Sequence, residues 1–406
     1  MALKQRLDTI VASHVASTED AEVRNKLLAA SFILVDHNGI IHSSTAGRLE
    51  FPPDSQPYTT SSICWVASLT KLVTAVSLLQ LVERGVLDLD ADLRTDVPEL
   101  GALEILRGFD SSDQPVLEPN TRPITLRQLL THTLGLGYDI PEPDLMRWSR
   151  AVGRTATNLD WSLAGFTTPL KFPPGDGWCY GAAYDWAGLL LARVTGQPLS
   201  AYMREHIFGP CGMESTTFWP REVDAEGKRT LATAVSDAEP GSGDAGSGLL
   251  KPGDRLVPDE HEMESGGAGL YTSPEDYGRF LSALLGHRLL SPQTTELLFR
   301  PQLDAAQRAM LRDAVSAAHD SYAPEFPRGT ELDHGLGGLI NVGDIPGKRR
   351  RGSMMWSGLT NGRWWVDRET GIAGAVFTNV IPFGNGVLSR MWDEIERAVY
   401  EEFGTR

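Results

Sequence analysis

The chain has 406 residues, of which 41% are hydrophobic and 22% charged, which is typical of a globular protein with two domains or one large domain with an insertion. Its net charge of -16 argues against a nucleic-acid partner, because a phosphate-binding surface needs clustered Lys and Arg. No stretch approaches the about 20 apolar residues of a membrane helix, and the N-terminus lacks the features of a secretory signal. The three cysteines, Cys64, Cys179 and Cys211, match neither a disulfide framework nor a zinc pattern. We therefore expect a cytoplasmic protein with no membrane partner, no metal and no other cofactor.

The N-terminal part of the chain predicts a helical start, a hairpin and a long helix. Residues 3–28 favour one or two helices. Apolar runs at 30–36 and 39–47 are joined by a short polar connection with a glycine after it, which indicates a β-hairpin. In 68–84 the apolar residues recur at helical spacing, and Gly85 follows as a helix stop.

The rest of the chain alternates between helices, loops and strands. A stretch at 95–124 dotted with prolines leads to a helix at 125–131, and the glycine-rich segment 240–248 predicts an exposed loop. A helix with a serine N-cap is expected at 273–285, and a final amphipathic helix at 386–403. Strands are predicted at 335–342, 362–367 and 371–380.

This order of elements predicts an α/β fold in which helices flank an antiparallel sheet. Consecutive strands that are joined by tight turns favour antiparallel pairing. We expect residues 1–95 and 262–406 to form one α/β domain, and residues 96–261 to form an inserted, mostly helical domain. The two parts together would make a single catalytic unit.

The tetrapeptide Ser68-Leu69-Thr70-Lys71, at the start of a predicted helix, carries the strongest chemical signal. A serine hydroxyl is a weak nucleophile at neutral pH and needs a base beside it. Positions three apart lie on one face of a helix, so Lys71 can reach the Ser68 oxygen. The positive end of the helix dipole also favours a developing oxyanion. Alone, the tetrapeptide is weak evidence, because a capping serine followed by a solvated lysine gives the same pattern.

The wider sequence resembles the serine β-lactamase-like superfamily, of the class C and family VIII esterase type. The resemblance implies a β-lactamase/transpeptidase-like fold, with Ser68 as the nucleophile and Lys71 as its activating partner. It further implies that Tyr180, in Tyr180-Gly181-Ala182, faces both residues and shares the proton transfer, a role that suits a phenol beside an ammonium. The matching blocks follow the same order and lie at 64–90, 124–139, 172–213, 266–285 and 356–371.

Two departures from the β-lactamase pattern are informative. Trp356-Ser357-Gly358 stands where β-lactamases have Lys-Thr-Gly, and Ala182 stands where they have an asparagine. The lysine of that triplet helps to hold the carboxylate of a β-lactam, which a tryptophan cannot do. The resemblance therefore implies the carboxylesterase and acyltransferase branch of the family, and efficient β-lactam hydrolysis is not expected.

Within that branch the chain is most similar to the fungal acyltransferases of polyketide pathways. This resemblance implies that Tyr138, Trp356, Gly358 and Leu359 bind the substrate. By analogy, the backbone N–H of Ser68 and the Gly358–Leu359 stretch would form the oxyanion hole, where glycine permits a close approach of the backbone. The segments that carry this finer resemblance are 100–126, 135–139, 143–148 and 185–191.

The leading prediction is a serine acyltransferase that moves an acyl group, through a Ser68 acyl-enzyme, to a hydroxyl of a small secondary metabolite. A carboxylesterase that uses the same acyl-enzyme stays open, as does a non-catalytic binding protein on the same fold. The expected partners are a small-molecule acyl donor and acceptor, and an acyl carrier protein is a further candidate as the donor.

Two other features are expected to have only structural roles. His132 could suggest a Ser–His–Asp triad, but a structural histidine at a helix end is the better interpretation. The basic run from Lys348 to Arg351 could suggest nuclear import, but we expect a solvated loop there.

Overall fold

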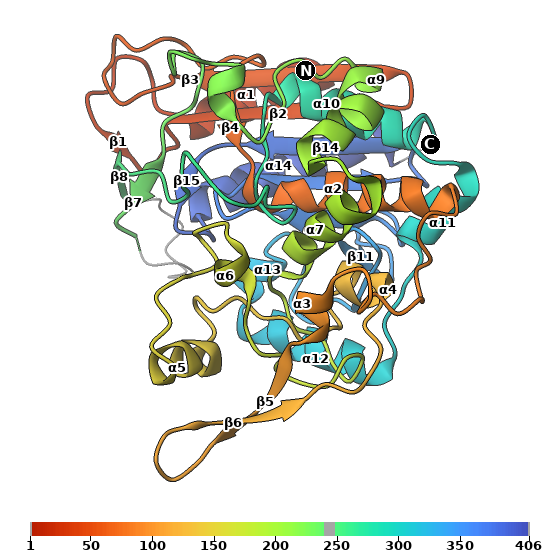
Figure 1. The fold of residues 1–406 in the computed structure, drawn as a ribbon. Helices are drawn as coiled ribbons and strands as arrows, with labels where there is room; N and C mark the ends of the chain where they lie inside the picture. Colours follow the sequence, from red (N-terminus) through yellow and green to blue (C-terminus); the bar gives the residue numbers. More distant parts are fainter. Residues whose placement is uncertain (1, 239–247, 405–406) are drawn as a thin grey trace.

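The computed structural model describes residues 2–238 and 248–404, so the predicted loop at 240–248 lies almost wholly outside the described residues. Its largest feature is a seven-stranded sheet in which all neighbouring strands are antiparallel (Figure 1). The strands, in sheet order, are β10 (Leu332–His334), β11 (Leu339–Asn341), β12 (Met354–Ser357), β13 (Arg363–Asp367), β14 (Ile372–Phe377), β2 (Ala29–Asp36) and β3 (Gly39–Gly47). The N-terminal hairpin therefore completes a sheet that the C-terminal part of the chain begins.

Helices cover both faces of this sheet because its central strands are apolar on both sides. They are α1 (Leu3–His14), α10 (Pro274–Leu285) and α14 (Gly386–Phe403). In β2, Phe32 stacks on Trp365 and meets the edge of Trp392 from α14, whereas Ile33 lies against Gly278 of α10. Successive side chains of a strand point to opposite faces, so α14 and α10 lie on opposite sides of the sheet. Helix α1 packs alongside α14.

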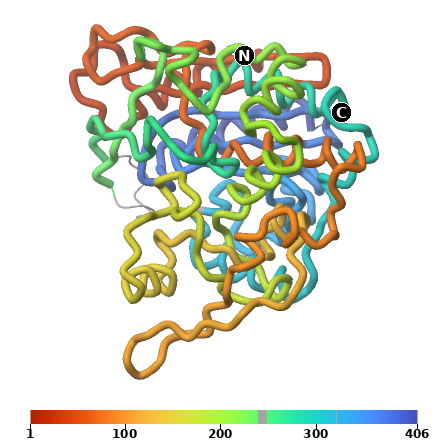
Figure 2. Tube along the Cα trace, viewed as in Figure 1, coloured from red at the N-terminus to blue at the C-terminus, as the bar shows by residue number. Residues whose placement is uncertain are grey.

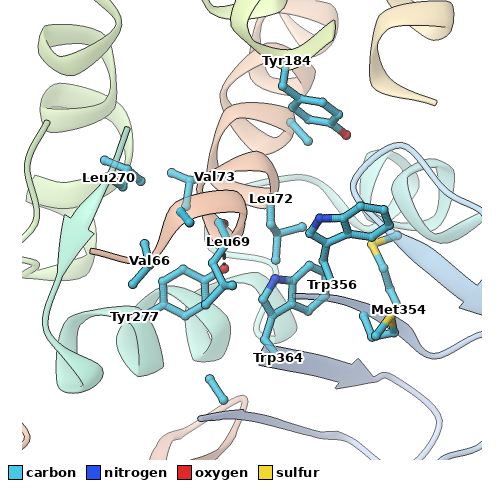
Figure 3. Close-up of a cluster of buried hydrophobic side chains, with 14 of the residues drawn as sticks. Val66, Leu69, Leu72, Val73, Tyr184, Leu270, Tyr277, Met354, Trp356 and Trp364 are labelled. Atoms are coloured by element: carbon cyan, nitrogen blue, oxygen red, sulfur yellow. Dashed lines mark hydrogen bonds between the residues drawn. The ribbon is translucent and has the colours of Figure 1, made fainter. Parts of the chain in front are cut away.

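Helix α2 (Thr70–Glu83) lies in the core and positions the predicted nucleophile. It follows a 3₁₀ turn at Ala67–Leu69 and is buried on all sides along most of its length. Figure 3 shows the apolar side chains that gather around its start. The Tyr277 hydroxyl of α10 donates a hydrogen bond to Leu69 O, which fixes the 3₁₀ turn to the rest of the fold. The helix ends before Gly85, whose φ of +69° favours glycine.

The other elements are mostly short helices, and they lie chiefly in the middle of the chain. These helices are α3 (Pro98–Gly101), α4 (Leu126–Leu130), α5 (Pro143–Ala151), α6 (Leu163–Phe166), α7 (Ala183–Thr195), α8 (Leu199–Met203), α9 (Gly209–Cys211), α11 (Pro292–Phe299), α12 (Ala305–Ala317) and α13 (His319–Tyr322). Short strands pair as β1 (Val23–Arg24), β8 (Leu249–Pro252), β7 (Ala234–Ser236) and β15 (Val380–Ile381) in one sheet, as β4 (Cys64–Trp65) with β9 (Tyr271–Thr272), and as β5 (Glu104–Phe109) with β6 (Pro115–Pro119). The β5–β6 hairpin projects from the molecule (Figure 2).

The predicted fold class is confirmed, together with the hairpin, the helix that begins at the serine, and the helices at 273–285 and 386–403. The prediction of helix throughout 3–28 is wrong after His14, because this segment turns back and forms β1. Strands β10 and β12 and the β5–β6 hairpin were not predicted. The division into two domains stays a prediction; strands β7 and β8 of the middle segment pair with β1 and β15 from the two ends of the chain.

Candidate active site

The start of α2 places Ser68 and Lys71 side by side. Ala67 has a φ of +44°, which is uncommon for a residue with a side chain, so the backbone turns sharply just before the serine. Lys71 Nζ donates a hydrogen bond to Ser68 Oγ over 3.1 Å. The serine is 9% exposed and the lysine 2%, so the ammonium is enclosed by protein while the hydroxyl borders a cavity. The spacing of three residues thus produces the contact that the sequence predicts.

Lys71 is held by three acceptors, which is the number that its three N–H donors require. Besides Ser68 Oγ, the ammonium donates to the Tyr138 hydroxyl over 3.3 Å and to Gly267 O over 2.8 Å. Nζ also lies 4.8 Å from the centre of the Tyr180 ring. Ala182, which replaces an asparagine of the β-lactamase pattern, contributes no polar side-chain atom here. The Tyr138 hydroxyl is one of the polar groups that surround the lysine instead.

Tyr180 completes the group around the serine. Its hydroxyl donates a hydrogen bond to Ser68 Oγ over 2.7 Å. The next residue, Gly181, packs directly on the neighbouring backbone, since a Cβ there would lie 2.2 Å from Leu136 O. This close packing holds Tyr138 beside Tyr180, with the two rings 5.4 Å apart and nearly perpendicular. Burial is the main cause that raises the pKa of Tyr138 well above its usual value, so this phenol is neutral near pH 7.

His132 lies behind Tyr180 in a group of aromatic rings. The two ring centres are 4.9 Å apart in an edge-on arrangement, and His334 lies 5.5 Å from His132. Neither ring nitrogen of His132 has a hydrogen-bond partner among the described residues. Burial lowers the pKa of His132 well below its usual range, so the ring is neutral. The histidine follows the end of α4 and packs as an aromatic side chain, with no hydrogen bond to Ser68 of the kind that a Ser–His pair needs.

Two residues that line the same cavity, Ser68 and Leu359, have backbone N–H groups that are free to bind an oxyanion. Neither the Ser68 N–H nor the Leu359 N–H donates to any acceptor in the described part of the chain. The Gly358 N–H, by contrast, donates to Gly362 O over 2.8 Å and closes the turn after β12. Within the Gly358–Leu359 stretch that was expected to supply one oxyanion donor, Leu359 is therefore the residue whose N–H is free. Gly358 permits a close approach instead, since a Cβ there would lie 2.7 Å from Val66 O.

A cavity of about 440 Å³ opens beside Ser68. All of the expected substrate-binding residues border it: Tyr138, Trp356, Gly358 and Leu359. Aromatic rings dominate the rest of its wall, namely Trp65, Trp161, Phe166, Tyr322 and Phe383. Among the described residues that line the cavity there is no Lys, Arg or His, and Asp185 is the single acidic side chain. The cavity therefore offers apolar surface and no cationic side chain for a substrate carboxylate.

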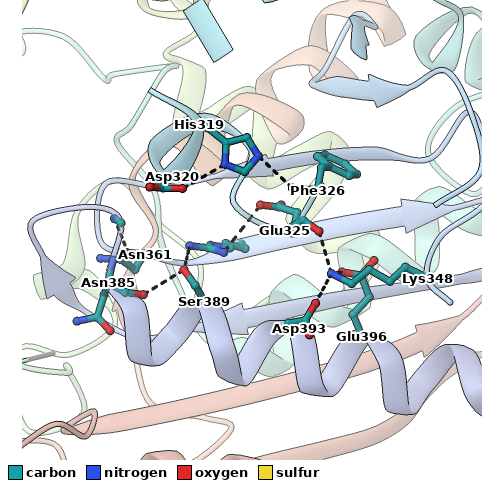
Figure 4. Close-up of polar contacts among 12 residues, drawn as sticks. His319, Asp320, Glu325, Phe326, Lys348, Asn361, Asn385, Ser389, Asp393 and Glu396 are labelled. Atoms are coloured by element: carbon teal, nitrogen blue, oxygen red, sulfur yellow. Dashed lines mark hydrogen bonds and ion pairs between the residues drawn. The ribbon is translucent and has the colours of Figure 1, made fainter. Parts of the chain in front are cut away.

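Buried charges lie around the segment that follows Tyr322 of the cavity wall, and Figure 4 shows those of Glu325, Lys348 and Asp393. The segment just after Tyr322 contains Glu325, whose carboxylate lies 3.8 Å from Arg363 of β13, and neither side chain is exposed. Lys348 Nζ donates to Glu325 O over 2.8 Å and pairs with Asp393 of α14. The prediction of a solvated loop is thus wrong for Lys348, because acids on α14 and a carbonyl of this segment enclose its ammonium.

Arg349 contradicts the same prediction. Its guanidinium is fully buried, and it makes two hydrogen bonds to Glu396 of α14, of 2.7 and 3.1 Å. A buried arginine needs such a paired acceptor, since an unpaired buried charge is costly. Of the basic run only Arg351 is exposed, as predicted; Arg350 is half-buried and donates a hydrogen bond to Gly404 O.

An antiparallel sheet between helices, with a serine at the start of a buried central helix, defines the class of serine enzymes built on the β-lactamase fold. The chain belongs to the beta-lactamase family, because the family model of that description matches residues 7–388. The lovastatin esterase of Penicillium rubens is 31% identical to it over 90% of this chain and 91% of the relative. Monacolin J acid methylbutanoyltransferase of Aspergillus terreus is 32% identical over 86% of this chain and 84% of the relative.

Comparison with a solved structure supports the same family assignment. A mutant of simvastatin synthase from Aspergillus terreus superposes with a TM-score of 0.86 at 29% identity, covering 100% of this chain and 95% of that one. The resemblance to the fungal acyltransferase branch is therefore confirmed.

Two residues at the site, Asp185 and Gly267, were not predicted from the sequence. Asp185 contacts the loop at 265–268, and Gly267 of that loop accepts the hydrogen bond from Lys71. The paired glycines at 266 and 267 were a usable signal, because adjacent glycines mark a close approach of the backbone.

In the described part of the chain, no three His, Cys, Asp or Glu side chains are arranged to hold a metal ion. No helix there is both long and apolar enough to span a bilayer.

Proposed function

We propose that this protein is a serine acyltransferase that passes an acyl group, through a Ser68 ester, to a hydroxyl of a small and mostly apolar metabolite. The observation that carries the proposal is the convergence of Lys71 Nζ and the Tyr180 hydroxyl on one oxygen, Ser68 Oγ, at 3.1 and 2.7 Å. A hydroxyl with two such proton-transfer groups is arranged for activation as a nucleophile. The transferases among the relatives support the choice of reaction.

In the acylation half, the Ser68 proton passes to the Lys71–Tyr180 unit while Oγ attacks the acyl carbon of a thioester or ester. We assign the binding of the resulting oxyanion to the N–H groups of Ser68 and Leu359, because both are free of other acceptors. The bond from carbon to the leaving sulfur or oxygen then breaks, and the unit returns the proton to the leaving group. In the transfer half, an acceptor hydroxyl gives its proton to the same unit and attacks the ester carbon, and Ser68 Oγ leaves as a hydroxyl.

The cavity supports a neutral, largely apolar substrate. Apolar contact with its aromatic wall stabilises a bound substrate by about 25 cal/mol per Å² of apolar surface that is buried. Trp356 lies where a β-lactamase has a lysine, and no described residue of the lining replaces that cation. We therefore propose a substrate without a carboxylate at the reacting end, and we include an acyl carrier protein among the candidate thioester donors.

A carboxylesterase is the second candidate, and the similarity to a lovastatin esterase favours it. It would use the same acyl-enzyme with water in place of the alcohol. A non-catalytic binding protein fits less well, since such a protein does not need a serine that is hydrogen-bonded to both a lysine and a tyrosine. The three free thiols support a reducing compartment, and we propose that the enzyme works in the cytoplasm.

The proposal is tested with a chromogenic short-chain ester. We expect a burst of released chromophore equal to the enzyme concentration, and a mass increase on the peptide that contains Ser68. Addition of a hydrophobic alcohol should divert the acyl group from acid to ester product, which separates a transferase from an esterase. If neither a burst nor a Ser68 adduct forms with any ester or thioester tried, the acyl-enzyme proposal is wrong.

A further inference from the structure

Asp185 is a buried acid that is joined to the lysine at the nucleophile through one loop, and its charge and that of Lys71 influence each other. It lies in the first turn of α7 and is 1% exposed. Its Oδ1 accepts hydrogen bonds from the Ser265 hydroxyl and, over 3.1 Å, from the Gly267 N–H. Its Oδ2 has no hydrogen-bond partner among the described residues. A buried carboxylate with one oxygen that lacks a hydrogen bond needs another favourable interaction to offset the cost of burial.

The loop that Asp185 holds is the same loop that holds Lys71. Gly267 O accepts a hydrogen bond from Lys71 Nζ over 2.8 Å. The loop is fastened on either side, since the Thr74 hydroxyl donates to Gly266 O and Trp65 Nε1 donates to Ala268 O. A Cβ on Gly267 would lie 2.8 Å from Asp185 Oδ2, so only glycine lets the carboxylate and the loop come this close.

We propose that Asp185 is a positioning residue for the proton-transfer unit: it fixes the Gly267 carbonyl against Lys71, and its negative charge stabilises the ammonium form of Lys71. This inference rests on the proposed function, because it assigns a role within the same acylation step. It adds a fourth member, through a loop, to the group formed by Ser68, Lys71 and Tyr180.

The charges around Lys71 support this role. Burial raises the pKa of Tyr138 and Tyr184 and lowers that of His132, so these three groups are neutral near pH 7. Burial also raises the pKa of Asp185, while the nearby Lys71 charge and the bonds from Ser265 and Gly267 lower it. The carboxylate and the ammonium therefore depend on each other. The titratable groups that face Lys71 in the described structure are Tyr138, Tyr180, Tyr184, His132 and Asp185.

The decisive variant is Asp185→Asn, which keeps the size and one acceptor oxygen but removes the charge. An opposite charge nearby favours the charged form of its neighbour. Without it, the proton should leave the Lys71–Tyr180 unit at lower pH. We expect the rising limb of the pH profile of acylation to move to lower pH. A merely structural role for Asp185 would lower the rate without moving the limb.

Asp276→Asn is the matched control. Asp276 is also a buried acid in the first turn of a helix, and it accepts the Ser215 N–H, but it does not contact the loop at 265–268. Its replacement should leave the limb in place. If Asp185→Asn still forms the Ser68 adduct and the rising limb of the pH profile does not move, the proposed positioning role of Asp185 is refuted, while the proposed function stands. If the wild-type protein forms no adduct, the proposed function itself is wrong.

A second variant covers the case in which Asp185→Asn does not fold. Gly267→Ala keeps every charge but forces the loop carbonyl away from Lys71, because its Cβ would meet the Asp185 carboxylate. We expect kcat to fall at least tenfold, since Lys71 would lose its aligned acceptor; KM can change as well, because Ser265 and Ala268 of the same loop line the cavity. An unchanged kcat would overturn the proposal.

Discussion

The proposed mechanism makes Lys71 and Tyr180 one proton-transfer unit, and a mutant cycle tests this directly. Lys71→Arg keeps a positive charge but cannot deprotonate, because guanidinium stays protonated in proteins. Tyr180→Phe keeps the ring and removes the hydroxyl that lies 2.7 Å from Ser68 Oγ. Both side chains contact the same oxygen, so each variant breaks the same proton path. A positioned acid or base contributes about 10²–10⁴-fold, or about 3–5 kcal/mol, to a rate.

The double variant distinguishes a shared unit from two separate contributors. If the two losses were independent, the double variant would be about 10⁴–10⁸-fold slower than the wild type. For a shared unit we expect it to lie within about tenfold of the slower single variant. The assay is the single-turnover acylation rate with a chromogenic ester, with the Ser68 adduct confirmed by mass. Losses that multiply would refute the shared unit, and a nearly wild-type Tyr180→Phe would remove Tyr180 from it.

A control is needed for the general effect of losing a buried phenol. Tyr202→Phe serves this purpose, because the Tyr202 hydroxyl bonds Gln80, near the other end of α2 from Ser68. We expect it to acylate at close to the wild-type rate.

Three other predictions follow from the site and its surroundings. Ser68→Ala should keep the fold by circular dichroism but lose several orders of magnitude in turnover, and more than about a tenth of the activity remaining would contradict the acyl-enzyme. With a chromogenic cephalosporin we expect kcat/KM well below 10⁵ M⁻¹s⁻¹, since Trp356 cannot hold its carboxylate; a value in the range of efficient enzymes, roughly 10⁵ M⁻¹s⁻¹ or above, would be inconsistent with this. Burial lowers the pKa of His334 from 6.5 to about 4, so its contribution to stability is present above pH 6.5 and is lost as the pH falls to about 4. Between pH 7 and 4, the free energy of unfolding should therefore fall by about 3 kcal/mol more in the wild type than in His334→Gln, as measured by urea denaturation; equal losses would show that His334 is not the group responsible.

Local patterns predicted the parts of the fold that depend on nearby residues. The hairpin at 29–47 and the helix at 386–403 follow from side-chain periodicity and turn residues, and both are present. The contact between Ser68 and Lys71 follows from helical geometry alone. Each of these features needs only a few consecutive residues to form, which is why a single sequence specifies them.

The features that were missed depend on partners far away in the chain. Lys348 and Arg349 have the composition of an exposed loop, and only the acids of α14 make their burial possible. The Gly267 carbonyl meets Lys71 because α7 and the loop after Ser265 fold against α2, which no local pattern encodes. The Gly358 N–H likewise donates to Gly362 O only because the chain turns back toward β13.

The choice between hydrolysis and transfer rests on the cavity rather than on the proton-transfer unit. Water and an alcohol attack the same Ser68 ester and need the same proton acceptor, so Lys71 and Tyr180 do not discriminate between them. An acceptor that buries about 100 Å² of apolar surface on the aromatic wall gains about 2.5 kcal/mol, roughly a 60-fold gain in occupancy, and water gains nothing comparable. The same acceptor also displaces water from the space beside the ester. We therefore expect the aromatic wall to favour transfer whenever a fitting alcohol is present. Part of this wall is Tyr322, and the buried ion pair of Glu325 stabilises the segment that follows it. Without such an alcohol we expect water to attack the same ester, which would explain how one fold can serve relatives named as esterases and as transferases.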